Sequence, residues 1–155
     1  MSVVRVESAT ETEALGAGLA SRLGPGDVVL VSGDLGVGKT TLIRGAAAAL
    51  GVRDPVVSPT FTIGRRYRRE GDGWLSHLDL YRIGDLAREE PWLLDDYLTP
   101  DAIVFVEWPE IAGDALGGDD IRVAAEVRIS HAGGDAREIE VSGPDEPLNV
   151  AELGL

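Results

Sequence analysis

The sequence predicts an α/β fold with a mostly parallel central sheet and antiparallel strands at its edges and C-terminal end. Residues 28–31 and 102–106 are continuous apolar runs, as in strands that are buried on both faces of a parallel sheet. From 121 to 129, apolar residues alternate with mostly polar ones, which is the pattern of a half-exposed strand. The chain has 155 residues, 44% of them hydrophobic, so we expect one domain over residues 1–155 with a single core.

The first third of the chain should supply an edge strand and two helices. Residues 3–6 can form the edge strand, and residues 10–13 (Thr-Glu-Thr-Glu) provide a capping box for a helix whose leucines recur at four-residue spacing. The alanine-rich segment 40–50 predicts the second helix, because alanine has the highest helix propensity. Gly51 follows it and can adopt the left-handed conformation that ends a helix.

The remaining elements follow from turn residues and prolines. Residues 61–67 and 74–80 predict two strands joined by a glycine-containing turn. Pro91 interrupts the region 85–98 and Thr99-Pro100 follows it, so we expect a short or broken helical segment there. Residues 137–141 can pair antiparallel with the alternating strand across two adjacent glycines, and the tail after about residue 143 is expected to be loosely ordered.

The most specific motif lies between the first buried strand and the alanine-rich helix. Residues 33–40 read Gly-Asp-Leu-Gly-Val-Gly-Lys-Thr, a complete phosphate-binding loop, and Lys39 is the only lysine of the chain. Its glycines let backbone N–H groups face phosphate oxygens, and the helix adds its positive N-terminal end. Lys39 would bridge the outer phosphates and Thr40 would ligate the accompanying Mg²⁺. This context predicts a three-layer P-loop nucleotide-hydrolase-like fold. The expected nucleotide-binding residues of the loop and helix start are Asp34, Leu35, Gly36, Val37, Gly38, Lys39, Thr40 and Thr41.

Acidic residues follow two other predicted strands. Glu107 ends the apolar run at 102–106, and a buried ionised acid needs a cation or strong hydrogen bonds. In an open α/β sheet, ligand-binding groups lie at such strand ends. Asp79 can serve catalysis, or it can end its strand or pair with Arg82. We expect His77 to be structural, because no second histidine or cysteine lies near it in sequence.

Composition limits the classes of function. The net charge of −13 opposes a broad footprint on nucleic acid, so any RNA contact should be local or shared with a partner. The chain has no cysteine, which excludes disulfides and thiolate metal sites and fits a reducing cytoplasm. It has neither a signal-peptide pattern nor an apolar run near the roughly 20 residues of a membrane span, so we expect a cytoplasmic protein without membrane contact.

One cluster of positive charge stands out in this acidic chain. Residues 65–69 read Arg-Arg-Tyr-Arg-Arg and hold four of the arginines. The cluster can be a solvated strand edge that charge protects from aggregation. It can equally dock a partner protein or tRNA.

Several segments together resemble one family, the TsaE (also called YjeE) P-loop ATPases of bacterial tRNA threonylcarbamoyladenosine synthesis. The matching segments span most of the chain and keep their order. They are Ser8 with Thr12, Leu15 and Gly16; residues 33–41; Ser58-Pro59-Thr60-Phe61; His77-Leu78-Asp79-Leu80-Tyr81-Arg82; and Val106-Glu107-Trp108-Pro109-Glu110. A phosphate-binding loop alone occurs in many enzymes, whereas this ordered set is far more specific.

The resemblance implies roles for individual positions. ATP or ADP is held by residues 33–40, and Thr40 and Glu107 belong to the Mg²⁺ site, with Glu107 similar to the Walker B carboxylate. Asp79 resembles a second acidic residue near the phosphates, which acts in hydrolysis or binds the metal through water. The implied catalytic residues are Lys39, Asp79 and Glu107, and the implied metal residues are Thr40, Glu107 and Asp79.

Three further positions lie outside the loop. Thr12 and Trp108 match family positions near the nucleotide, although Trp108 can also be a core residue, because aromatic side chains bury large areas. Arg137 resembles an arginine that follows a glycine in the family, here with Asp135 and Ala136 intervening. Ser58, like the other hydroxyl residues around it, can satisfy the backbone of a turn or can sense the nucleotide.

The function that this resemblance implies is that of a Mg²⁺-dependent ATPase that is weak alone. It would be required for the threonylcarbamoyl modification of the adenosine next to the anticodon in tRNA, with TsaB and TsaD as partners and tRNA contacted only through the complex. The isolated chain should be monomeric or weakly self-associating. Two alternatives are a small-molecule kinase with an arginine-rich lid and Asp79 as base, and a nucleotide switch that only binds.

Overall fold

The computed structural model describes residues 2–59, 62–81, 83–84, 90–143 and 153. Residues 85–89 of the expected broken helical segment and residues 144–152 of the expected loose tail lie outside these ranges. The strands are β1 (Ser2–Val6), β2 (Asp27–Gly33), β3 (Gly64–Arg68), β4 (Trp74–Asp79), β5 (Ala102–Glu107), β6 (Arg122–His131) and β7 (Arg137–Ser142). The helices are α1 (Ala9–Ala20) and α2 (Lys39–Ala49), with the 3₁₀ segments η1 (Pro91–Leu94) and η2 (Pro109–Leu116).

All seven of these strands form one sheet in the order β1-β7-β6-β2-β5-β4-β3. The central strands β6, β2, β5 and β4 pair in parallel, whereas β3 pairs antiparallel to β4 and β7 pairs antiparallel to both β6 and β1. The predicted fold class, with its parallel centre and antiparallel edges and C-terminal end, is therefore confirmed. The two most apolar strands, β2 and β5, lie side by side in the middle because both of their faces are covered.

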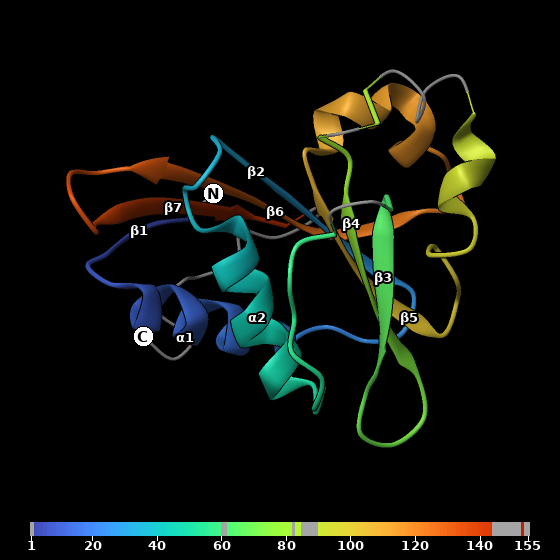
Figure 1. The fold of residues 1–155 in the computed structure, drawn as a ribbon, viewed down its shortest axis with the longest axis horizontal. Helices are drawn as coiled ribbons and strands as arrows, with labels where there is room; N and C mark the ends of the chain where they lie inside the picture. The colour runs from blue at the N-terminus through green and yellow to red at the C-terminus, as the bar shows by residue number, and fades with distance from the viewer. Residues whose placement is uncertain (1, 60–61, 82, 85–89, 144–152, 154–155) are drawn as a thin grey trace.

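The sheet separates two layers of apolar side chains (Figure 1). Helices α1 and α2 lie together on one face, and the 3₁₀ segments lie on the other. Side chains alternate along β5, so Ile103 and Phe105 pack on the α1/α2 side while Val104 and Val106 pack with η1 and η2. By the same alternation Glu107, the last residue of β5, lies on the side of α2.

Glycines let α1 and α2 approach each other closely. A Cβ placed on Gly16 would overlap the carbonyl oxygen of Leu42 in α2, and a Cβ placed on Gly45 would overlap the carbonyl oxygen of Glu13 in α1. The two helices therefore pack backbone to backbone at these points. This contact also sets the position of the phosphate-binding loop, because the loop leads directly into α2.

The helix cap differs from the one expected. Ser8, rather than Thr10, is the N-cap of α1, and its Oγ accepts a hydrogen bond from the N–H of Glu11 at 3.2 Å. The Glu11 carboxylate accepts in turn from the N–H of Glu7 at 2.9 Å. Ser8 and Glu11 have the same Ser/Thr-x-x-Glu spacing as Thr10 and Glu13, so the motif was recognised in the wrong register by two residues.

No helix within the described part of the chain has both the length and the apolar character needed to span a membrane.

The α1–α2 contact gives a stability prediction. Gly45→Ala should lower the free energy of unfolding by about 1–3 kcal/mol, because the added methyl group overlaps backbone that cannot move without shifting α1. This loss would occur although alanine favours an isolated helix by about 1 kcal/mol. Denaturant unfolding followed by circular dichroism measures it.

Ala48→Gly on the exposed side of α2 is the matched control. It should cost no more than the helix-propensity difference of about 1 kcal/mol. A Gly45→Ala variant as stable as the original chain would contradict the close contact.

Candidate functional site

The phosphate-binding loop connects β2 to α2 in a conformation that requires glycine. Gly33, Gly36 and Gly38 have φ values of 146°, 72° and 113°, which side chains rarely allow. A Cβ on Gly33 would lie 2.5 Å from the carbonyl oxygen of Ile129 in β6, whereas nothing lies within 4 Å of a Cβ on Gly36. Gly33 thus permits close packing on the sheet, and Gly36 keeps the outer surface of the loop open.

Lys39 lies at the mouth of the loop with its ammonium group turned back over it. Its Nζ donates to the carbonyl oxygens of Gly33 at 2.5 Å and Asp34 at 2.8 Å, and it lies 4.4 Å from the centroid of the Trp108 ring. Burial lowers the pKa of Lys39, and the negative charge of Glu107 opposes this shift. Carbonyl oxygens and an aromatic face thus hold a desolvated cation at the position where phosphate oxygens would approach.

The other predicted loop residues differ in their exposure. The Leu35 side chain is 61% exposed, whereas Val37 is buried in the core, so these two would offer only backbone groups to a phosphate. Thr41 is half-buried in the first turn of α2.

Two predicted residues support the loop from outside it. The methyl group of Thr12 lies 3.9 Å from a Cβ position on Gly38, while its hydroxyl donates to the Ser8 carbonyl oxygen at 3.3 Å. The Arg137 Nε donates to the carbonyl oxygen of Val37 at 2.8 Å. Both residues therefore lie beside the loop, as expected, but their polar atoms bind backbone. Their contact with nucleotide stays a prediction.

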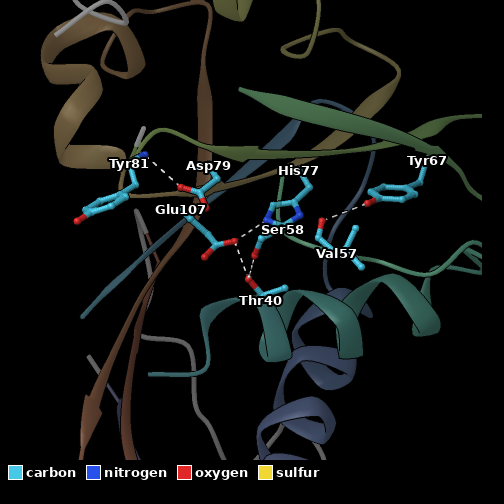
Figure 2. A network of polar contacts seen from close by, with 8 residues as sticks. All are labelled: Thr40, Val57, Ser58, Tyr67, His77, Asp79, Tyr81 and Glu107. Atoms are coloured by element: carbon cyan, nitrogen blue, oxygen red, sulfur yellow. Dashed lines mark hydrogen bonds and ion pairs between the residues drawn. The ribbon is translucent and has the colours of Figure 1, made fainter. Parts of the chain in front are cut away.

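The alternation of β4 and β5 brings the predicted acidic residues together. His77 and Asp79 lie on the same face of β4 as Leu75, which packs on the α2 side, and Glu107 lies on that face of β5. Asp79 and Glu107 are register partners on neighbouring parallel strands. Thr40 approaches them from the first turn of α2 (Figure 2).

A chain of polar contacts joins these elements, as Figure 2 shows. The Thr40 hydroxyl donates to Glu107 Oε2 at 3.0 Å and lies 2.7 Å from the Ser58 hydroxyl. His77 Nε2 lies 2.5 Å from the same Glu107 oxygen. Glu107 is only 3% exposed and His77 is fully buried. One oxygen of the Glu107 carboxylate is therefore contacted both by Thr40 of α2 and by His77 of β4.

Asp79 lies at the edge of this network, half-buried. Its Oδ1 accepts from the N–H of Tyr81 at 3.1 Å. Burial raises the pKa of the Asp79 carboxyl, and the charge of Glu107 adds to this shift, whereas the Tyr81 N–H and Lys39 oppose it. Such a carboxylate is costly to keep ionised and is well suited to interact with a proton or a cation.

Trp108 follows β5 with a left-handed backbone, at φ 58° and ψ 49°. This turn takes its ring out of the strand alternation, over the Lys39 ammonium and against Tyr81, with ring centroids 4.8 Å apart. Trp108 also borders the core cluster on the η1/η2 side. Both expected roles, core packing and nucleotide contact, are compatible with this half-buried position.

These groups fit a nucleotide with Mg²⁺. Mg²⁺ prefers oxygen ligands, and Thr40, Glu107 and Asp79 offer a hydroxyl and two carboxylates next to a phosphate-binding loop. No group of three or more His, Cys, Asp or Glu within the described ranges could hold a metal by itself.

The sequence did not predict that His77 and Ser58 belong to this network. His77 was expected to be structural, yet it contacts Glu107, and Ser58 contacts Thr40 across 18 positions. The period of two along β4 was the available signal for His77, since residues 77 and 79 must share a face.

The arginines of residues 65–69 are partly engaged within the chain. Arg66 and Arg68 lie with their guanidinium carbons 4.7 Å and 5.0 Å from the centroid of the Trp74 ring, and Arg66 also donates to the Thr99 hydroxyl at 3.0 Å. They lie on β3, the outer strand of the sheet, and Arg68 is paired with the first residue of β4. Arg68 pairs with Trp74 at the far end of β4, whereas Arg65 is the register partner of His77. A lid over the site stays an untested alternative. The expected strand-edge role fits, and docking stays a prediction.

Comparison with known proteins places this site in a family. The model of the family described as "Threonylcarbamoyl adenosine biosynthesis protein TsaE" matches residues 6–139. The tRNA threonylcarbamoyladenosine biosynthesis protein TsaE of Streptomyces coelicolor is 40% identical over 91% of this chain and 96% of its own length. The Bacillus subtilis protein of the same name is 38% identical over 87% of this chain and 81% of its own.

A solved structure agrees. The crystal structure of Bacillus subtilis YdiB matches with a TM-score of 0.68 and 33% sequence identity, covering 89% of this chain and 82% of that one. The resemblance seen in the motifs thus extends over the whole fold. The chain belongs to the TsaE family of threonylcarbamoyl adenosine biosynthesis proteins.

Proposed function

We propose that this protein binds ATP and ADP with Mg²⁺ and hydrolyses ATP slowly as a subunit of the machinery that makes threonylcarbamoyladenosine in tRNA. One observation carries the ATPase part of the proposal. Thr40, the last residue of the phosphate-binding loop, donates a 3.0 Å hydrogen bond to Glu107 at the end of the adjacent strand. This is the pairing that a P-loop ATPase needs to hold Mg²⁺ between its loop and its Walker B carboxylate.

Each side chain has a physical task in this proposal. The N–H groups around Gly36 and Gly38 bind phosphate oxygens, and the Lys39 ammonium exchanges its carbonyl partners for the outer phosphates. Thr40 and Glu107 hold Mg²⁺, which neutralises phosphate charge when it is bound. Asp79 would orient the attacking water or bind the metal through water, and its half-buried position suits either role.

The biological setting follows from the family. A biosynthesis protein of this kind acts with others, and we propose TsaB and TsaD as the partners and the cytoplasm as the compartment. A net charge of −13 favours contact with tRNA only through that complex. Turnover by the isolated chain, a monomer or weak self-associate, is slow because such sites depend on an ordered switch or a partner's charge.

The alternatives differ in what becomes of the phosphate. ATP hydrolysis should be measured for the chain alone, with TsaB and TsaD, and with candidate small-molecule acceptors. Release of inorganic phosphate that rises with the partners supports the proposal. A phosphorylated acceptor would establish a kinase, and binding without turnover in the complete mixture would establish a switch.

Removing groups from the site should separate function from folding. Lys39→Ala, Thr40→Ala and Glu107→Ala should each lower Mg²⁺-dependent ATP turnover by at least about 100-fold, because each removes a charge or a ligand at the phosphates. A malachite green assay with TsaB and TsaD measures phosphate release.

Arg44→Ala, an exposed change on α2, is the control for a lost positive charge. It should leave turnover unchanged, and circular dichroism should show every variant folded. Full turnover by Glu107→Ala would remove this carboxylate from the site.

The ionised Asp79 side chain should support turnover but lower the stability of the fold. Its pKa is raised in the folded state, so the protonated form is favoured there, and ionisation at neutral pH destabilises the fold. Asp79→Asn should therefore raise Tm at pH 7 while it impairs turnover. The gain should shrink as the pH falls toward and below the ordinary carboxyl value of 3.8, where the original side chain is also neutral.

Thermal melts of both proteins from pH 3.5 to 8 test this dependence. A lower Tm for Asp79→Asn at pH 7 would show that the ionised carboxylate stabilises the fold instead.

The exposed arginines allow a sharper docking test than the whole cluster. Arg65 and Arg68 are exposed, although Arg68 also stacks on Trp74, whereas Arg66 is half-buried and bound to both Trp74 and Thr99. The double change Arg65→Ala with Arg68→Ala should weaken association with TsaB and TsaD more than it weakens ATP binding. Isothermal titration calorimetry measures both affinities.

The matched control is Arg44→Ala with Arg53→Ala, which removes the same charge from exposed positions elsewhere. Equal effects of the two double variants on association would leave residues 65–69 with the strand-edge role only.

A further inference from the structure

We propose that His77 is a positioning residue for Glu107. In this arrangement the Nε2–H group of the imidazole donates to Glu107 Oε2 and so fixes the carboxylate with its other oxygen free for the metal. This inference rests on the proposed Mg²⁺–ATP site. It assigns to a buried side chain of the sheet core a task in setting metal affinity.

The position of His77 in β4 is the first support. His77 is fully buried, and its register partner in β5 is Phe105, two residues before Glu107. Its side chain lies on the same face as Asp79, and its Nε2 lies 2.5 Å from Glu107 Oε2. In Figure 2 the ring points at this oxygen, and the second Glu107 oxygen points away from it.

Counting donors and acceptors around Glu107 shows which nitrogen of His77 must carry a hydrogen. An ionised carboxylate only accepts, so the imidazole nitrogen that faces it must carry the hydrogen. Oε2 then accepts from both Thr40 and His77, while Oε1 has no protein donor among the bonds of the described residues. The buried Nδ1 of His77 also has no partner within those residues.

Fixing Glu107 matters because its side chain is long and charged. Ordering a glutamate side chain costs rotamer entropy, and the two hydrogen bonds offset that cost before a metal binds. Groups that orient a metal ligand in this way typically change metal affinity about 10- to 100-fold when they are removed. A histidine that only fills the core would have no such effect, and an apolar side chain of similar size could replace it.

Substitution separates these two roles. His77→Leu fills the space without a donor, and His77→Gln keeps an N–H at similar reach. Mn²⁺ serves as the metal probe, and its binding to the protein with a non-hydrolysable ATP analogue is measured by electron paramagnetic resonance. His77→Leu should weaken Mn²⁺ binding about 10- to 100-fold while metal-free binding of the analogue stays unchanged, and His77→Gln should restore most of the loss. The exposed His131→Gln is the control.

The protonation state has its own readout in the unsubstituted protein. The chain has two histidines, so His131→Gln assigns their imidazole signals in ¹⁵N NMR. Nε2 of His77 should give the shift of a protonated nitrogen. A bare Nε2 would overturn the proposal. This measurement decides the matter even where His77→Leu fails to fold.

The outcomes also separate this inference from the proposed function. Wild-type affinity for Mn²⁺ in a folded His77→Leu variant would reduce His77 to a core residue while leaving the ATP site intact. Absence of ATP-analogue and Mn²⁺ binding by the unsubstituted protein would refute the proposed function, with the NMR result still reporting on the hydrogen bond.

Discussion

The candidate site is arranged around one buried carboxylate, that of Glu107. A buried charge is tolerated only where donors or cations surround it, and here the hydroxyl of Thr40 and the imidazole of His77 both reach the same oxygen. This requirement explains the arrangement around it. The first turn of α2 must approach the end of β5, and the close α1–α2 contact at Gly16 and Gly45 holds α2 in that place. The position of α2 relative to the end of β5 therefore matters both for the packing of the fold and for the site.

The groups around Glu107 are individually unfavourable in the charged form. Burial shifts the pKa of Lys39 down and that of Asp79 up, so each is pushed toward its neutral state. The opposite charges of Lys39 and Asp79 partly offset these two pKa shifts, whereas the charge of Glu107 offsets that of Lys39 and adds to that of Asp79. A ligand that carries both phosphates and a cation would relieve both shifts at once, since it supplies partners of each sign. The arrangement is therefore pre-organised at a cost in stability.

Much of the fold was readable from local patterns. The apolar runs of β2 and β5 and the loop before α2 depend on neighbouring residues, and the structure confirms these elements. The motif set was also sufficient to identify the family. Local reasoning failed at the α1 cap, where Ser8 and Thr10 begin identical motifs two residues apart and only the packing of α1 chooses between them.

Contacts between distant segments could not be predicted. Arg137 donates to Val37, 100 positions away, and His77 contacts Glu107, 30 positions away. In neither pair does the local sequence of one residue indicate that it contacts the other. The strand alternation could place His77 and Asp79 on one face, but not choose which face of the sheet α2 covers. The stacking of Arg66 and Arg68 on Trp74 could not be predicted either, because it depends on the register of the β3–β4 hairpin.

The pairing of β1 with β7 has a consequence for the order of events during synthesis. The phosphate-binding loop leaves the ribosome early, but the guanidinium that supports it belongs to β7, and β7 also completes the sheet beside β1. The N-terminal strand must therefore wait for nearly the whole chain before it finds its neighbour. Such long-range closure slows folding and makes it cooperative. A nascent chain that ends before Arg137 would carry the entire phosphate-binding motif without the guanidinium that donates to the Val37 carbonyl oxygen of the loop.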